Sequence, residues 1–237
     1  MGTFLRTLVL GVALAATASG CGQGDEGDVD WDSLPIAQDD EKADSAAGGL
    51  VWVRPSAFPI YCIGAPCATK QVFEVNREEA RLIYKYDWRS LRLSTKDAEA
   101  ADANHFNMLL RGRYAQVKVM GRDMEVLQIT RANMKVSTVA GDNVEKDTYY
   151  VTKEPVCGKQ PCPTVQADLL NNQKGLPPEQ WPTVDLSVLG LGDSQQRSLL
   201  AEMQSKTGQV MVSQTTTPAG TKQVSQAFRN LKAPPLK

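Results

Sequence analysis

The chain has 237 residues, and its 42% hydrophobic content is enough for one large folded domain or two small ones. Its formal net charge of −1, with no run of Lys and Arg interleaved with aromatic residues, excludes a nucleic-acid partner recognised through charge. No phosphate-binding glycine loop, EF-hand loop or His-Glu-x-x-His motif indicates a cofactor or a metal, and we expect neither.

Residues 1–20 have the features of an export signal, with a positive charge at Arg6 and an apolar stretch too short to span a bilayer. The motif Ala18-Ser-Gly-Cys21 then resembles the lipobox of bacterial lipoproteins, although Ala18 stands where leucine is usual. The resemblance implies that Cys21 is lipidated and anchors the mature chain to a membrane. Gly22, in place of the Asp that often marks inner-membrane retention, favours the outer membrane. The alternative is an ordinary secretory signal with an accidental Cys21.

Residues 21–49 contain nine acidic residues against the single Lys42, with little apolar surface. Such a composition does not offset the entropy of ordering, so we expect a disordered acidic tether after the lipidated cysteine. Trp31, Leu34 and Ile36 form an apolar island that could dock on another surface, but a solvated spacer is the favoured interpretation.

One phrase occurs twice, as Cys62-x3-Pro-Cys67-x3-Gln71-x4-Asn76 and as Cys157-x3-Pro-Cys162-x3-Gln166-x4-Asn171. A second phrase, Asp-x3-Leu-x-Leu, begins at Asp87 and at Asp185 in the same order. The two phrases indicate a duplicated module, with one copy at 50–144 and the other at 145–237, packed together as one compact domain.

The expected elements of the first copy are strands at 51–54, 70–75 and 81–88, a helix at 97–110, and a hairpin of 114–120 with 124–130. The second copy is expected to have strands at 148–152, 209–212 and 224–232, a strand or one helical turn at 164–170, and a helix at 194–206. This pattern predicts an α+β fold: two tandem units, each of antiparallel strands plus one helix and a disulfide-stapled loop.

Several of these residues resemble a domain of uncharacterised function found in exported bacterial proteins. The resemblance covers about residues 50–215 and is carried by Trp52-Val-Arg-Pro55, Phe73-Glu-Val-Asn76-Arg77, Tyr149-Tyr-Val, Leu170-Asn171 and the Cys-x3-Pro-Cys corners. It implies a location in the cell envelope and offers no activity or catalytic residue.

Four cysteines besides Cys21 in an exported chain indicate disulfides. We favour Cys62–Cys67 and Cys157–Cys162, because each pair is local and a proline bends the loop between its members. Pairing between the two copies stays open, as does a zinc site of all four cysteines, which an oxidising envelope disfavours. A redox dithiol is disfavoured because its usual spacing is Cys-x2-Cys.

Other candidate residues are weighed against structural roles. His105 is the single histidine, and packing is favoured over general-base chemistry. Asp87 and Asp185 could act as an acid/base pair, but an Asp at a strand end more often caps the following turn. Tyr84, Tyr86, Trp88, Tyr149 and Tyr150 could form an aromatic binding surface, and core packing is favoured.

The sequence therefore predicts a lipid-anchored cell-envelope protein that acts as a binding or surface-interaction module. Its expected partners are the membrane, through Cys21, and an envelope or extracellular protein. We assign no catalytic residue, and the alternative function is an envelope hydrolase that uses carboxylates.

Overall fold

The computed structural model describes residues 29–38, 49–57, 60–77, 80–136, 148–158, 160–172, 174–206, 210–218 and 220–236. The predicted export signal at 1–20 and the predicted lipidation site Cys21 lie outside the described residues. None of the helices in these ranges has the length and apolar character needed to cross a membrane.

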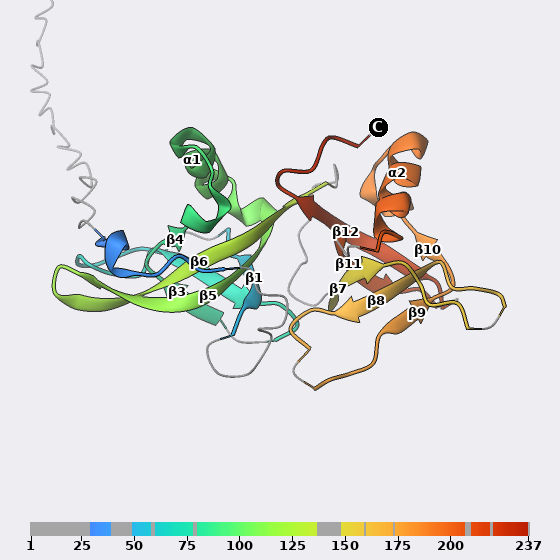
Figure 1. Ribbon diagram of the computed structural model, residues 1–237, viewed down its shortest axis with the longest axis horizontal. Coiled ribbons are helices and arrows are strands. Elements are labelled where there is room, and N and C mark those ends of the chain that lie inside the picture. Colours follow the sequence, from blue (N-terminus) through green and yellow to red (C-terminus); the bar gives the residue numbers. More distant parts are fainter. Residues whose placement is uncertain are drawn as a thin grey trace, which may run out of the picture.

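The same order of strands and α-helices occurs twice (Figure 1). The first half contains β1 (Val51–Pro55), β2 (Lys70–Glu74), β3 (Ala80–Ile83), β4 (Tyr86–Asp87), the 3-10 helix η2 (Arg89–Leu91), α1 (Thr95–Ala103), η3 (His105–Asn107), β5 (Met108–Val119) and β6 (Arg122–Lys135). The second half contains β7 (Thr148–Lys153), β8 (Val165–Leu169), β9 (Glu179–Trp181), β10 (Val184–Asp185), η5 (Ser187–Leu189), α2 (Asp193–Met203), β11 (Val210–Thr216) and β12 (Lys222–Asn230). A short 3-10 helix, η1 (Trp31–Ser33), precedes both halves.

The twelve strands of the described ranges belong to one sheet, in which the main path runs β3-β2-β1-β5-β6-β12-β11-β7-β8-β9. The order reads the same from either end if each strand is exchanged for its counterpart in the other half, so β6 and β12 meet at a pseudo-two-fold axis. Neighbours along this path are antiparallel, whereas β4 pairs with β6 and β10 pairs with β12 in parallel. Figure 1 shows α1 and α2 on the same face of the sheet.

The predicted α+β fold of two small units is wrong. The described chain is mainly one large antiparallel sheet, against which the two α-helices of nine and eleven residues are minor elements. The strands of both halves form a single sheet because β6 pairs with β12. The boundaries 50–144 and 145–237 stay a prediction.

The helix predicted at 97–110 ends early, and this error is one source of the wrong fold class. The observed α1 stops at Ala103, and Met108 already begins β5. Leu109 and Leu110 pair with Asn133 and Ala132 of β6, and their side chains reach cores on opposite faces of the sheet. Two adjacent apolar residues fit a strand buried on both faces as well as they fit a helix.

Three of the hydrophobic clusters form the centre of the fold, one beneath each helix and one in the middle of the opposite face. Ala101 of α1 packs in the first cluster with residues such as Val53 and Leu110, and Leu199 and Met203 of α2 pack in the second. The central cluster combines both halves: Trp52, Val75, Leu109, Tyr149, Leu170, Met211 and Phe228. Its burial therefore depends on the two halves staying together.

Asn76 connects the first half to the second. Its Nδ2 donates to the carbonyl oxygens of Tyr149 and Leu170, each at 2.8 Å, and its Oδ1 accepts from the Tyr149 amide at 2.7 Å. Asn76 has φ 60°, a left-handed conformation that Asn adopts more readily than most residues. The side-chain amide thus forms hydrogen bonds with the backbone of β7 and of the residue after β8, in the way that the backbone amide of a neighbouring strand would.

Asn171 makes the reciprocal contacts from the second half. Its Nδ2 donates to the carbonyl oxygens of Trp52 at 2.7 Å and Val75 at 2.9 Å, and its Oδ1 accepts from the Trp52 amide at 2.8 Å. Its φ is 51°, again left-handed. Since β1 and β7 are separated by four strands in the sheet order, these contacts require the sheet to curl.

We expect Asn76→Gly to lower the free energy of unfolding by about 3 kcal/mol, because it removes three hydrogen bonds of about 1 kcal/mol each while keeping the left-handed backbone. Asn76→Ala should cost about 1 kcal/mol more, since alanine is strained in that conformation. Urea titration followed by circular dichroism measures both.

The matched control is Asn172→Gly, because Asn172 bonds to Leu176 within its own loop. If Asn76→Gly costs no more than this control, the bonds between the halves do not hold the sheet together.

Candidate functional site

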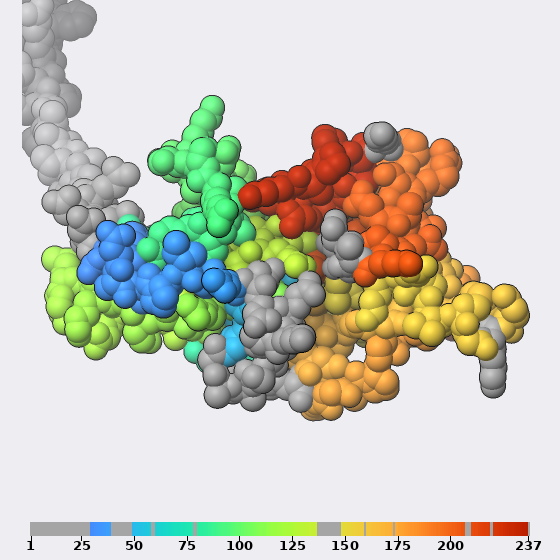
Figure 2. All heavy atoms as spheres, in the orientation of Figure 1, coloured from blue at the N-terminus to red at the C-terminus, as the bar shows by residue number. Residues whose placement is uncertain are grey.

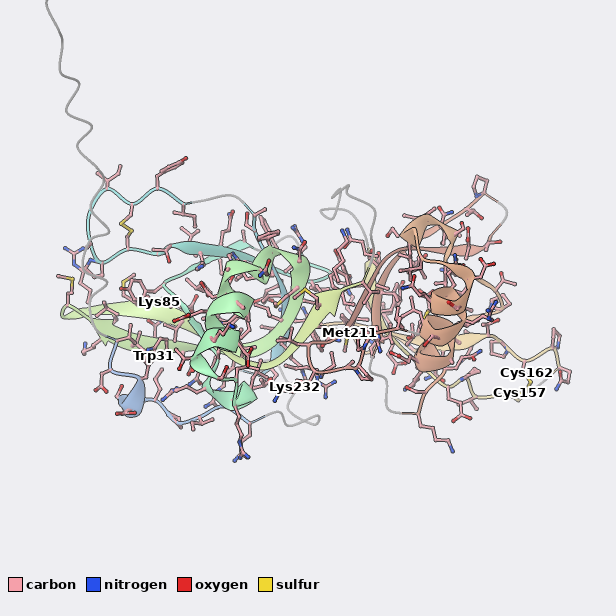
Figure 3. The ribbon with its side chains drawn as sticks, turned by 90° about the horizontal axis from the view of Figure 1, so that it is seen from above. Trp31, Lys85, Cys157, Cys162, Met211 and Lys232 are labelled. Atoms are coloured by element: carbon pink, nitrogen blue, oxygen red, sulfur yellow. A yellow bond between two sulfur atoms is a disulfide. The ribbon has the colours of Figure 1, made fainter. Side chains whose placement is uncertain are left out.

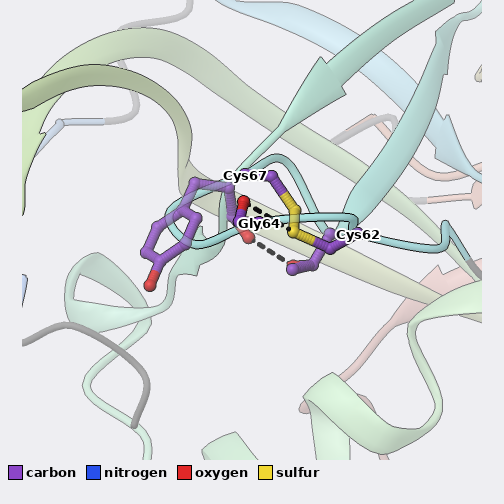
Figure 4. The surroundings of a disulfide bond; sticks show 5 residues. Cys62, Gly64 and Cys67 are labelled. Atoms are coloured by element: carbon purple, nitrogen blue, oxygen red, sulfur yellow. Dashed lines mark hydrogen bonds between the residues drawn. A yellow bond between two sulfur atoms is a disulfide. The ribbon is translucent and has the colours of Figure 1, made fainter. Parts of the chain in front are cut away.

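The two cysteine loops are closed by disulfides, Cys62–Cys67 and Cys157–Cys162, and the favoured local pairing is confirmed. The paired Cα atoms lie 6.1 and 5.1 Å apart. Figure 4 shows the first loop, in which the Gly64 carbonyl oxygen lies 3.1 Å from the Cys62 sulfur. The zinc alternative needs four thiolates, and these bonds leave none of the four cysteines available for it.

The first loop presents large apolar side chains to solvent. Tyr61 is 87% exposed and Ile63 is fully exposed, on either side of Cys62. In the second loop the position that corresponds to Tyr61 is Val156, which is 74% exposed, and the position that corresponds to Ile63 is Gly158. Figure 3 places Cys157 and Cys162 at one end of the molecule. The two loops therefore have the same closure but unequal apolar surfaces.

The apolar island of the tether docks on the protein's own first half. Val29 is buried, and Trp31 and Leu34 pack with Val117 and Val126 of the β5–β6 hairpin. Figure 2 shows this segment in blue lying against the yellow-green hairpin. The solvated spacer predicted here is wrong for residues 29–38, because burial of these side chains offsets the cost of ordering. Ile36 is the exception and remains exposed.

An ion pair at the end of β4 holds the docked segment. The Arg89 guanidinium donates to both carboxylate oxygens of Asp87 at 2.9 Å, and it also donates to the carbonyl oxygens of Trp31 and Leu34. Gln128 donates to Asp87 at 3.2 Å and to the Pro35 carbonyl oxygen at 2.8 Å. These side chains thus donate hydrogen bonds to backbone carbonyl oxygens of a segment more than fifty residues earlier in the chain.

Burial alone would raise the pKa of the Asp87 carboxyl. The hydrogen bonds from Arg89 and Gln128, together with the charge of Arg89, outweigh it and hold that pKa below its ordinary value. Asp87 is therefore ionised at neutral pH and serves as an anchor for Arg89, not as a proton donor.

Asp185 occupies the corresponding position in the second half. Its carboxylate accepts from the Ser187 amide at 2.9 Å and from Gln223 at 3.0 Å, as Asp87 accepts from the Arg89 amide at 3.1 Å. The favoured turn-capping role of both residues is confirmed. Figure 1 shows β4 and β10 in opposite halves, so the two carboxylates do not form the acid/base pair weighed as an alternative.

His105 packs against the Tyr86 ring, with ring centroids 5.4 Å apart, and its Nδ1 donates to the Asp102 carbonyl oxygen. Burial lowers the pKa of His105 below its usual value despite that hydrogen bond, so the ring is neutral at pH 7. The five aromatic residues considered as a binding surface are all buried, which confirms core packing: Tyr84, Tyr86, Trp88, Tyr149 and Tyr150.

A second ionised carboxylate, Glu179, lies at the outer strand β9. It accepts from the Tyr150 hydroxyl at 2.7 Å and the Trp181 indole at 2.9 Å, and it forms an ion pair with Lys222 at 3.0 Å. Burial favours a higher pKa for Glu179, but these three partners lower it below its ordinary range. Burial and the bond to Glu179 raise the pKa of Tyr150 to about 12. Both groups keep one protonation state near neutrality, which suits a structural role.

Within the described ranges, no group of three or more His, Cys, Asp or Glu side chains is arranged to hold a metal ion. Comparisons of the chain with protein-family models, with curated proteins and with solved structures find no match. The functional argument consequently depends on the surface chemistry of this molecule.

Two features of the candidate site were missed in the sequence. Tyr61 and Ile63 could have been found, because two large apolar residues within a Pro- and Gly-rich loop are a signal of an exposed contact. The anchoring of residues 29–38 by Arg89 and Gln128 could not, since nothing in sequence spacing links these residues to the tether.

We expect Arg89→Ala to release residues 29–38 and to lower the free energy of unfolding by about 3 kcal/mol, because the buried Asp87 carboxylate loses its charge partner. Hydrogen exchange of the 29–38 amides measures the release. The contribution of the pair should be complete above about pH 4, the ordinary pKa of Asp, and should be lost as the pH falls through the lowered pKa of Asp87.

Lys118→Ala is the control, because it breaks the exposed pair with Asp123 and should change stability by less than about 1 kcal/mol. Unchanged exchange of residues 29–38 in Arg89→Ala would show that the apolar contacts alone hold the segment.

Proposed function

We propose that this chain is a lipid-anchored protein of the bacterial cell envelope and acts as a binding module. The lipobox-like motif ending at Cys21 supports the anchor, and two closed disulfides fit an oxidising compartment outside the cytoplasm. The observation that carries the binding role is the exposure of Tyr61 and Ile63 on the Cys62–Cys67 loop.

The loop suits protein recognition for two physical reasons. Aromatic and large aliphatic side chains supply most of the free energy at protein interfaces once a pocket of the partner desolvates them. A disulfide that fixes the loop before binding reduces the conformational entropy lost on association. The expected partner is an envelope or extracellular protein that offers an apolar pocket to Tyr61 and Ile63.

The second loop is a weaker contact surface. Its counterpart of Ile63 is Gly158, and Gln160 lies at its tip beside the Cys162 sulfur, to which its amide donates at 3.3 Å. One half of the sheet therefore carries the proposed contact, and the other provides a matched comparison within the same molecule.

A hydrolase that uses carboxylates has less support. Asp87 and Asp185, the two carboxylates that the repeated phrase selects, cap turns in opposite halves. Hydrolysis by two carboxylates needs both on the same substrate, within about 10 Å of each other.

The lipid anchor is tested by Cys21→Ser. We expect the wild-type protein to partition into the detergent phase and the variant into the aqueous phase, because the variant lacks the thiol that carries the lipid. Mass spectrometry of the N-terminal peptide should show acylation of Cys21 in the wild type.

Ser19→Ala is the control, since it keeps a small residue in the motif. A mature wild-type chain with an unmodified Cys21 thiol would refute the anchor and leave the binding role to be judged separately.

The loop contact is tested by photo-crosslinking in intact cells, with a photoreactive residue at position 63 and, for comparison, at position 158. We expect one discrete protein adduct from position 63. Tyr61→Ser should reduce its yield about tenfold, the effect of losing one interface anchor, and should leave stability within about 0.5 kcal/mol because the side chain is exposed.

Val156→Ser makes the corresponding change in the second loop and should leave the adduct unchanged. Equal adduct yields from positions 63 and 158, or an adduct insensitive to Tyr61→Ser, would contradict a contact made by the first loop.

A further inference from the structure

Two adjoining hollows, of about 410 and 310 Å³, lie on the surface of the first half. They share Ser90, Arg92 and Thr130, so η2 and β6 form a common floor. The docked segment at 36–38 borders one hollow, and the end of β12 with the two residues after it, at 230–232, borders the other. We call the two hollows together the η2 groove. Its size is within the range of small-molecule sites.

The groove is lined by cations. Arg89, Arg92, Arg131 and Lys232 contribute to it, whereas no Asp or Glu is among the described residues of its lining. The charge of Arg89 is balanced by Asp87. The Lys232 ammonium donates to the Leu91 carbonyl oxygen at 2.7 Å, which holds it over η2, and Figure 3 shows Lys232 near the middle of the molecule.

Arg92 has an unfavourable backbone conformation. Its φ of 49° and ψ of 42° are left-handed, which costs a residue with a Cβ roughly 1–2 kcal/mol. The corresponding residue after η5 is Gly190, with φ 68° and ψ 17°, for which the conformation is free of that cost. Among the described residues, the Arg92 guanidinium makes no hydrogen bond or ion pair that would offset the strain.

The second half lacks a matching cation at another position too. In the register of the sheet, Arg131 of β6 lies opposite Arg111, beside the bulge of β5. The equivalent position beside the bulge of β11 is Gln226, which lies opposite Ser213. The fold is therefore compatible with Gly and Gln where the first half has Arg92 and Arg131. Strain of this kind is typical of functional sites.

We propose that the η2 groove binds a phosphate-bearing group, up to the size of a sugar phosphate. A guanidinium fork binds phosphate oxygens with two parallel hydrogen bonds, and a lysine ammonium adds a point charge. Arg92 and Lys232 both line the second hollow, and the bond to the Leu91 carbonyl oxygen places the Lys232 ammonium next to η2. This site is independent of the Cys62–Cys67 loop.

The test is isothermal titration of the whole mature protein with pyrophosphate and with glucose 6-phosphate, at low and at physiological salt. We expect binding to the wild type, and a loss of at least about tenfold in affinity in Arg92→Gly and in Lys232→Gln, the effect of one charge-assisted contact. Arg92→Gly should not unfold the protein, because Gly190 already occupies the equivalent position.

Arg197→Gln is the control, because it removes an exposed cation from α2 without touching the groove. Equal weakening in this variant would indicate diffuse charge attraction and would overturn the proposal, as would unchanged affinity in Arg92→Gly.

A second arm identifies the source of the phosphate. Flotation with vesicles of phosphatidylcholine, with or without phosphatidylglycerol, is carried out on protein that carries Cys21→Ser so that no anchor contributes. Binding to the anionic vesicles that Arg92→Gly abolishes would assign a lipid headgroup, and binding of the soluble phosphates alone would assign a free ligand. Binding of neither probe would refute the site.

Discussion

The reciprocal hydrogen bonds of Asn76 and Asn171 are the constraint on which the rest of the structure depends. Each side chain bonds to the backbone of the opposite half, and each is placed by a left-handed turn at the end of β2 or β8. The β6–β12 seam alone would join the halves along one line, around Phe228 and Lys135. With the asparagine contacts the sheet curls, and the central cluster around Leu109 and Met211 becomes buried.

This symmetry makes the differences between the halves informative. Packing explains the features that both halves have, such as the turn-capping Asp87 and Asp185. It does not explain the features that one half alone has: the exposed Ile63, and the strained Arg92 where the other half has Gly190. Since the same fold tolerates simpler residues at the equivalent positions, these side chains are the ones for which a function is needed.

The sequence predicted the local features well because their causes are local. The disulfide pairing follows from the spacing of Cys62 and Cys67, and the turn-capping role of Asp87 and Asp185 follows from their place at strand ends. The fold class failed because the β6–β12 pairing is made between residues about a hundred positions apart, and no pattern within either strand indicates it. The repeated Asn76 and Asn171 were visible as fixed points, but their bonding across the halves depends on the curl of the sheet.

The docking of residues 29–38 changes what an anchor at Cys21 would mean for the whole protein. Without docking, the tether between the lipid and the folded sheet would consist of residues 21–49. Because Val29 is packed against the first half, the tether is shortened to the eight peptide links between Cys21 and Val29. Eight residues span at most about 29 Å even when fully extended. If Cys21 carries the lipid, Arg89 and its bonds to Trp31 and Leu34 therefore hold the first half close to the membrane. The η2 groove, bordered by the same docked segment, would then lie within reach of the lipid headgroups, whereas the second half could extend away from them.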